Sequence, residues 1–111
     1  MNPKAINTDE GRAIVVTDNR DASRFEAYDD KKLAGFADYI RTEQLVAFVH
    51  TEVDPSYEGQ GVGAKLARAG MESVRADHLQ ALPVCPFISG WLSRHPEFAD
   101  LSYRSASRVT D

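Results

Sequence analysis

The hydrophobic pattern of this chain changes its period at one place, the glycine-rich segment Glu58-Gly59-Gln60-Gly61-Val62-Gly63. Before this segment, apolar and β-branched residues come in short runs that are typical of strands. After it, apolar and small residues recur at helical spacing, with charged residues on the opposite side. A single helix that leads from one strand to the next predicts a crossover connection, and therefore one parallel strand pair.

The strand patterns before the glycine segment are separated by short polar turns, which favour antiparallel neighbours. One more strand and a short helix follow the long helix, and the short helix is expected to end at His95-Pro96 because proline disrupts a helix. The expected strands are Ala13–Thr17, Arg24–Tyr28, Leu33–Arg41, Leu45–Val49 and Leu79–Val84, and the short helix is Phe87–Arg94.

Two of these strands carry a further prediction. Leu45–Val49 is apolar at every position, which predicts a central strand that is covered on both faces. Gly35 interrupts Leu33–Arg41, and a glycine inside a strand indicates either a bulge or the close approach of another backbone segment.

The long helix begins at Val62 and has a buried stripe and a charged stripe. The expected buried residues are Val62, Leu66, Ala69, Gly70, Ser73 and Val74, and the charged ones are Lys65, Arg68, Glu72 and Arg75.

The fold class that follows is α/β of the α+β type. We expect a mixed, mostly antiparallel sheet with one parallel pair and two main helices. The chain has 111 residues, enough for one domain and its single core. We expect a flexible leader over residues 1–12 and a single domain over residues 13–111, since the first residues are polar and lack a periodic pattern.

Composition excludes several classes of function. The net charge of −4 leaves no basic face for nucleic acid and slightly favours a cationic substrate such as an amine. The single cysteine, Cys85, rules out an internal disulfide.

No apolar run reaches the roughly 18 residues of a membrane helix, and the N-terminus lacks a signal-peptide pattern, so a cytoplasmic location is expected. Histidine, cysteine and carboxylate residues show no metal-ligand spacing, which predicts no metal.

The glycine segment lies between a predicted strand and a predicted helix, a context that suits phosphate binding. Glycines let backbone N–H groups approach a phosphate, and the helix N-terminus adds free donors and a positive dipole end. The spacing is neither a Walker A loop nor a dinucleotide fingerprint. The alternative is a turn whose glycines serve only conformation and packing.

Four blocks of sequence, in this order and at this spacing, resemble the short, YjdJ-like branch of the GNAT N-acetyltransferase superfamily. The resemblance covers about residues 13–101. The blocks are His50-Thr51-Glu52-Val53, the glycine segment, Pro83-Val84-Cys85-Pro86-Phe87 and Arg94-His95-Pro96-Glu97-Phe98.

The resemblance implies acetyl-CoA as cofactor, transfer to an amine acceptor, and a compact GNAT-like fold in which the parallel strand pair splays around the pantetheine arm. Gly61 and Gly63 match the glycines of the family loop Gln/Arg-x-x-Gly-x-Gly/Ala, whereas Glu58 departs from its first position. Helices that most relatives carry between their first two strands have no room here, so the acceptor cannot be transferred from them. The cofactor-binding residues implied are Val53, Gly59, Gln60, Gly61, Val62, Gly63, Lys65, Pro86 and Phe87.

The resemblance also places His50, Glu52 and Cys85 near the thioester, as candidate catalytic residues. His50 and Glu52 are two apart on a strand and therefore share a face, and either one can act as the base, directly or through a water. A backbone N–H near Val53 is the candidate oxyanion donor. Cys85 is a covalent acetyl carrier, a residue that lines the cofactor channel, or a buried core residue.

Each candidate also has a structural alternative. His50 can be a structural histidine, Glu52 a solvated carboxylate and Lys65 part of a charged helix face. For the whole chain, the alternative to a transferase is an acyl-CoA-binding or protein-interaction module. A phosphate-binding domain unrelated to CoA is a third reading. The expected assembly is a monomer or weak dimer.

Overall fold

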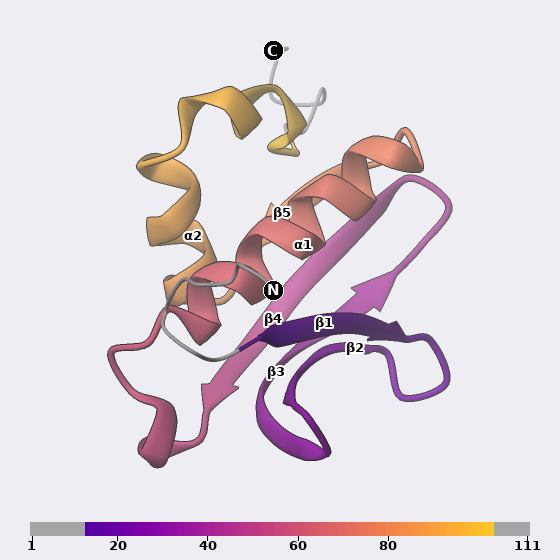
Figure 1. Cartoon of the computed structure of the whole chain (residues 1–111). Coiled ribbons are helices and arrows are strands. Elements are labelled where there is room, and N and C mark those ends of the chain that lie inside the picture. The colour runs from indigo at the N-terminus through magenta and orange to yellow at the C-terminus, as the bar shows by residue number, and fades with distance from the viewer. Residues whose placement is uncertain (1–12, 104–111) are drawn as a thin grey trace, which may run out of the picture.

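A five-stranded sheet in the order β1-β2-β3-β4-β5 forms one layer of the molecule, and two helices form the other (Figure 1). The computed structural model describes residues 13–103, so the predicted leader over residues 1–12 lies outside the described residues. The elements are β1 (Ile14–Asn19), β2 (Arg24–Asp29), β3 (Lys32–Arg41), β4 (Leu45–Val53), the 3-10 turn η1 (Pro55–Tyr57), α1 (Val62–Ala76), β5 (Gln80–Pro83), α2 (Pro86–Ser93) and the 3-10 segment η2 (Pro96–Leu101).

The strand directions confirm the predicted fold class. Strands β1 to β4 pair antiparallel through short turns, and β5 pairs parallel with β4 after the α1 crossover. The predicted turns are short enough to leave no helix between β1 and β2.

Gly35 fulfils both of the alternatives that the sequence left open. The register between β2 and β3 shifts beside it, because Ala27 pairs with Gly35 and Tyr28 pairs with Leu33. A Cβ on Gly35 would also lie 2.7 Å from the carbonyl oxygen of Glu52 in β4. The bulge and the close approach therefore occur together, at the end of β4 that leads to the glycine segment.

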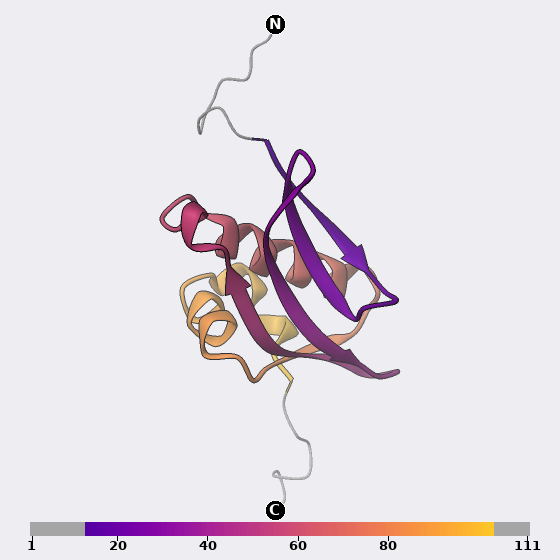
Figure 2. The ribbon, with the colours of Figure 1, turned by 90° about the horizontal axis from the view of Figure 1, so that it is seen from below.

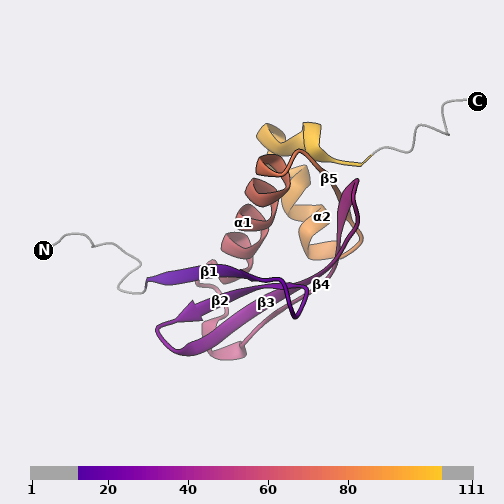
Figure 3. The same ribbon diagram turned by 90° about the vertical axis from the view of Figure 1, so that its right-hand side faces the viewer.

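Both helices lie on the same side of the sheet, and the described residues leave the other side open (Figures 2 and 3). The expectation that β4 is covered on both faces holds only in part: Ala47 on the open face is 8% exposed, but no second layer of described elements covers that face. Ile40, which pairs with Ala47 of β4 and shares its face, is 59% exposed. The apolar character of β4 reflects its pairing on both edges and its burial under helices on one face.

Helix α1 lies on the sheet through a face that differs slightly from the predicted one. Ala67 and Met71 are fully buried, whereas Ala69 and Ser73 are only partly buried, so the stripe is rotated toward the first pair. Gly70 brings the helix close to the sheet, since a Cβ there would lie 2.8 Å from the Phe48 ring.

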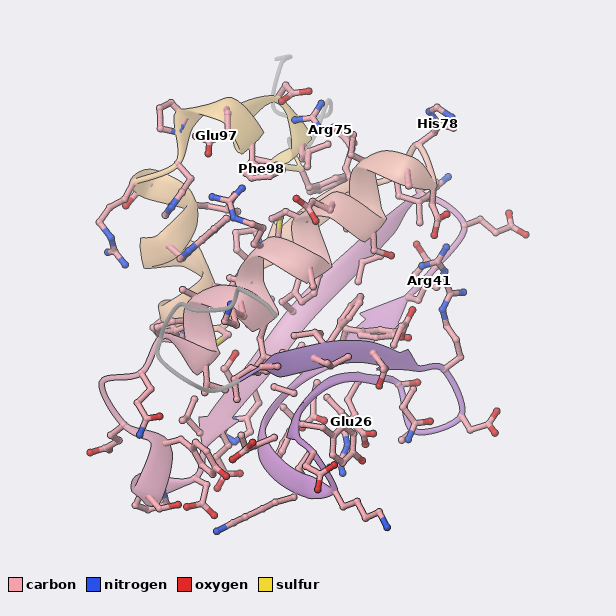
Figure 4. All side chains as sticks on the ribbon, viewed as in Figure 1. Glu26, Arg41, Arg75, His78, Glu97 and Phe98 are labelled. Atoms are coloured by element: carbon pink, nitrogen blue, oxygen red, sulfur yellow. The ribbon has the colours of Figure 1, made fainter. Side chains whose placement is uncertain are left out.

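The C-terminal end of α1 is held by η2, as the cluster of labelled side chains in Figure 4 shows. The guanidinium of Arg75 pairs with Asp100 at 3.1 Å, donates to the carbonyl oxygen of Glu97 at 2.8 Å, and lies over the Phe98 ring.

No helix among the described residues is long and apolar enough to cross a membrane.

Candidate functional site

Strands β4 and β5 separate part-way along their length, and this divergence creates the candidate site. They pair only from Leu45 to Phe48, opposite Gln80 to Pro83. The Cys85 N–H makes the next contact by donating to the Phe48 carbonyl at 2.8 Å. The register of β4 against β3 then shifts, because Asp38 pairs with His50 and Tyr39 with Phe48. Beyond this bulge β4 continues to Val53 while β5 has ended, which is the predicted splay.

Cys85 lies in this gap at the N-cap position of α2 and is only 5% exposed. Its Sγ atom is 3.4 Å from Oγ1 of Thr51 in β4. Burial opposes ionisation of the thiol, but hydrogen bonds to the Thr51 hydroxyl and to the backbone N–H groups of Ile88, Phe87 and Thr51 outweigh it. The pKa of Cys85 is therefore lowered from its ordinary value.

A cavity opens at the N-terminus of α1. Gly61 is the N-cap residue and offers no side-chain cap, so the first-turn N–H groups of the helix remain available to a ligand. On the α2 side the walls of the cavity are the apolar side chains of Phe87 and Trp91, and Arg94 is the cationic residue among those that line it. It is lined by Val53, Tyr57, Glu58, Gly59, Gly61, Val62, Gly63, Ala64, Phe87, Trp91 and Arg94.

The three glycines of this loop are required for two different reasons. Gly59 and Gly61 have φ values of 78° and 81°, the left-handed region that favours glycine, and a Cβ on either would meet nothing nearby. Gly63 lies within α1, where a Cβ would be 2.7 Å from the Phe87 ring. The first two glycines thus shape the loop, whereas the third makes room for α2.

His50 and Glu52 face the open side of the sheet. His50 Nε2 and Glu52 Oε1 are 3.2 Å apart, and the His50 ring contacts Phe36 of β3. Both side chains are well exposed, at 56% and 64%. Strand alternation therefore places them on the side of β4 opposite Thr51 and Cys85. The structure brings His50 and Glu52 together and keeps the pair apart from the thiol.

A second cavity lies at the end of β4, beside Glu52. It is lined by Leu33, Ala34, Gly35, Phe36, Glu52, Val53, Asp54 and Pro55. Val53 lines both this cavity and the cavity at the N-terminus of α1, so the two cavities are neighbours.

Some of the predicted cofactor residues lie outside the loop cavity. Lys65 is on the exposed face of α1, Pro86 is the exposed first residue of α2, and the Gln60 amide donates to the Ser56 carbonyl at 3.3 Å. None of the three lines the cavity.

Sequence reasoning missed several residues of the site. Thr51 belongs to the first of the four blocks that resemble the family, but its role depends on the bulge that turns it toward Cys85. Arg94 begins the last of these blocks, whereas Tyr57 and Trp91 belong to no block and show only the pattern of ordinary core aromatics. No cluster of three or more potential metal ligands occurs among residues 13–103.

A model of the GCN5-related N-acetyl-transferase family matches residues 24–101. The chain belongs to this family. Acetyl transfer is therefore its general chemistry, and acetyl-CoA is the donor that the family generally uses.

A solved structure shows the same fold. It is the solution structure of a GCN5-like protein from Staphylococcus aureus that is described as a predicted N-acetyltransferase. It is 22% identical, covers 91% of this chain and 97% of its own, and has a TM-score of 0.61. No protein with a curated description matches the chain.

The residues of the loop cavity fit an acyl-CoA. The uncapped N-terminus of α1 and the Arg94 guanidinium suit its phosphates, and Phe87 and Trp91 offer apolar walls. Beyond Phe48, β4 no longer pairs with β5, so the edge of β4 there can offer backbone groups to an amide-containing arm.

Proposed function

We propose that this chain binds acetyl-CoA at the Gly59–Gly63 loop and transfers the acetyl group to an amine by direct attack. The observation that supports the proposal is that Val53 lines both the cavity at the N-terminus of α1 and the neighbouring cavity that Glu52 lines. We further propose that residues 13–111 form one domain of the short, YjdJ-like branch of the family.

The N–H groups at the start of α1 hold the phosphates, and the free edge of β4 after the bulge holds the pantetheine arm. When bound, the cofactor supplies an activated acetyl thioester. The protein's own residues position this group in the gap between β4 and β5 and exclude water from its inner side.

Glu52 or His50 removes the proton that the attacking amine must lose. As the amine nitrogen bonds to the acetyl carbon, the C–S bond of the thioester would break, and the coenzyme would leave as a thiolate that takes up a proton. The two side chains lie 3.2 Å apart, so one can accept the proton while the other orients it. Their exposure on the open face gives an amine direct access.

A backbone N–H at the end of β4 stabilises the developing oxyanion. The Asp54 N–H donates to the Ala34 carbonyl of β3 at 2.8 Å. Because antiparallel N–H groups alternate in direction, the N–H of Val53 points away from β3 and toward the gap.

Cys85 lines the gap in this scheme and does not carry the acetyl group. Its thiol is held between Thr51 and the start of α2, on the side of β4 away from the base. A covalent route would need His50 or Glu52 to reach the thiol, and both point to the other face of the strand.

One feature favours the second candidate, an acyl-CoA-binding module with little transferase activity. The short turn between β1 and β2 leaves the open sheet face without the helices that would enclose an acceptor. The remaining predictions are a cytoplasmic monomer or weak dimer with no nucleic-acid partner.

Isothermal titration with acetyl-CoA, with CoA and ATP as controls, tests the cofactor site. We expect saturable binding of both CoA forms.

Acetyl transfer to a panel of amines is then compared between the wild-type protein and the variants Glu52→Gln and His50→Gln. Loss of a general base typically costs about 10²–10⁴-fold in rate. Loss of transfer with retained binding supports the enzyme. Binding with no transfer to any amine favours the module, and absence of binding to either CoA form overturns the proposal.

A further inference from the structure

Arg94 differs from the other arginines of the described chain in lacking a carboxylate partner. Within residues 13–103, every other arginine forms an ion pair: Arg20, Arg24, Arg41, Arg68 and Arg75. No such pair forms at Arg94 in the same range. A guanidinium is always charged and has five N–H donors, so an unpaired one is available to an external anion.

The position of Arg94 directs this charge at the loop cavity. Arg94 is the C-cap residue of α2, and its Nη1 atom folds back to 3.5 Å from the position that a Cβ on Gly90 would occupy. It lines the cavity together with Gly61, Gly63 and Trp91. The guanidinium and the N-terminus of α1 thus belong to one concave surface, although they come from different helices.

The loop itself lacks the side-chain donor that phosphate binding would use. Glu58 lines the same cavity with a carboxylate, which disfavours an anion at that end. Lys65 does not line the cavity. Arg94 is therefore the cationic side chain that this cavity presents, and its charge offsets that of Glu58.

We propose that Arg94 binds the pyrophosphate of the coenzyme, opposite the N–H groups that begin α1. This assignment rests on the proposed acetyl-CoA site. In it, Arg94 supplies the side-chain donor that the loop lacks, because Glu58 stands where the family loop has Gln or Arg. Guanidinium groups bind phosphate oxygens in bidentate geometry, which suits this role better than the point charge of a lysine.

The test compares wild type with Arg94→Gln by titration with CoA, dephospho-CoA and pantetheine. Dephospho-CoA keeps the pyrophosphate but lacks the 3′-phosphate, and pantetheine lacks both. We expect Arg94→Gln to weaken CoA and dephospho-CoA equally, by about tenfold or more, the scale of a lost charged hydrogen bond. Pantetheine, followed by ligand NMR, should bind wild type and variant alike.

Two variants serve as controls. Arg20→Gln removes the same charge at the β1–β2 turn, far from the cavity, and should leave all three ligands unaffected. Arg94→Lys keeps the charge but loses the fork of donors, and should fall between wild type and Arg94→Gln. Thermal unfolding of each variant checks that the fold is kept.

Three outcomes would overturn the assignment. Unchanged CoA affinity in Arg94→Gln would remove Arg94 from the site. Weaker CoA with unchanged dephospho-CoA would move its contact to the 3′-phosphate. An equal loss for pantetheine would mean that Arg94 only shapes the cavity. If wild type binds no CoA form, the proposed function itself falls, and this inference falls with it.

Discussion

Cys85 Sγ lies 3.4 Å from Thr51 Oγ1, and this contact bridges the gap where β4 and β5 separate. The two residues are 34 positions apart in the chain. The bulge in β4 turns Thr51 toward the gap, and the end of β5 delivers Cys85 to the start of α2. The thiol thus meets a hydroxyl and helix N–H groups at once, which lowers its pKa against the opposing effect of burial.

The first prediction concerns this thiol. Because the pKa of Cys85 is below its ordinary value of 9.0, its thiolate should form at a lower pH than that of a free cysteine. Thr51→Val removes the hydroxyl at nearly constant volume and should shift the midpoint to higher pH. The chain has a single cysteine, so ultraviolet thiolate absorbance reports on this site alone.

The wild-type protein in denaturant gives the reference midpoint for an unfolded thiol. A native midpoint at or above this reference, or no shift on Thr51→Val, would show that burial dominates and that the hydroxyl does not stabilise the thiolate.

The second prediction separates direct attack from a covalent route. Cys85→Ala should keep most of the acetyl-transfer activity, because the proposed base lies on the other face of β4. Intact-mass measurement of wild type with acetyl-CoA and no amine should show no acetylated protein. An acetyl adduct that disappears in Cys85→Ala together with turnover would establish a covalent route.

The sequence was informative about the fold for a clear physical reason. Strand and helix periods are local, so the switch at residues 58–63 correctly predicted the crossover and the parallel pair. The face of α1 was less accurate, since Ala69 and Ala67 have the same apolar character and only the position of the sheet decides which is buried. The residues Val46, Ala47 and Phe48 of β4 are buried as predicted, but a second covering layer is not present among residues 13–103, because an apolar run does not reveal whether one helix layer or two are present.

The site was harder to foresee, because it depends on register. A one-residue bulge at the middle of β4 places His50 and Glu52 on the open face while Thr51 meets Cys85, and no local pattern in β4 indicates that bulge. Gly63 matched a cofactor motif and does line the cavity, but the ring of Phe87 is what leaves no room for a side chain there. The cavity role of Arg94 required the fold of α2 against α1.

The third prediction concerns Glu26, which lies on the open face of the sheet and is only 5% exposed (Figure 4). Burial opposes its ionisation, but hydrogen bonds from Arg24, Tyr28 and Asn19 prevail and lower its pKa below the ordinary 4.5. The native state therefore holds fewer protons than the unfolded state between the two pKa values. This stabilisation is full above about pH 4.5 and is lost as the pH falls through the native value.

The free energy of unfolding, measured by urea denaturation at a series of pH values, should fall on acidification. In Glu26→Gln the part of this slope that Glu26 contributes should vanish, although the variant is less stable at neutral pH. An unchanged slope in Glu26→Gln would mean that other carboxylates cause the acid sensitivity. The matched comparison is Asp77→Asn, because Asp77 pairs with Arg41 at 2.6 Å and its pKa is also lowered.

The fourth prediction uses two glycines inside helices whose replacement by alanine should have opposite effects. Helix propensity alone favours alanine by about 0.5–1 kcal/mol. A Cβ on Gly90 in α2 would meet only Arg94, at an ordinary 3.5 Å, so Gly90→Ala should raise the free energy of unfolding by about 0.5–1 kcal/mol.

A Cβ on Gly70 in α1 would lie 2.8 Å from the Phe48 ring, which is fully buried and cannot move aside. Gly70→Ala should therefore be destabilising by about 1–3 kcal/mol, the usual effect of overpacking. Chemical denaturation of both variants gives the two signs. A stabilised Gly70→Ala would mean that α1 can move away from the sheet at no cost, and that its close approach to Phe48 is not required.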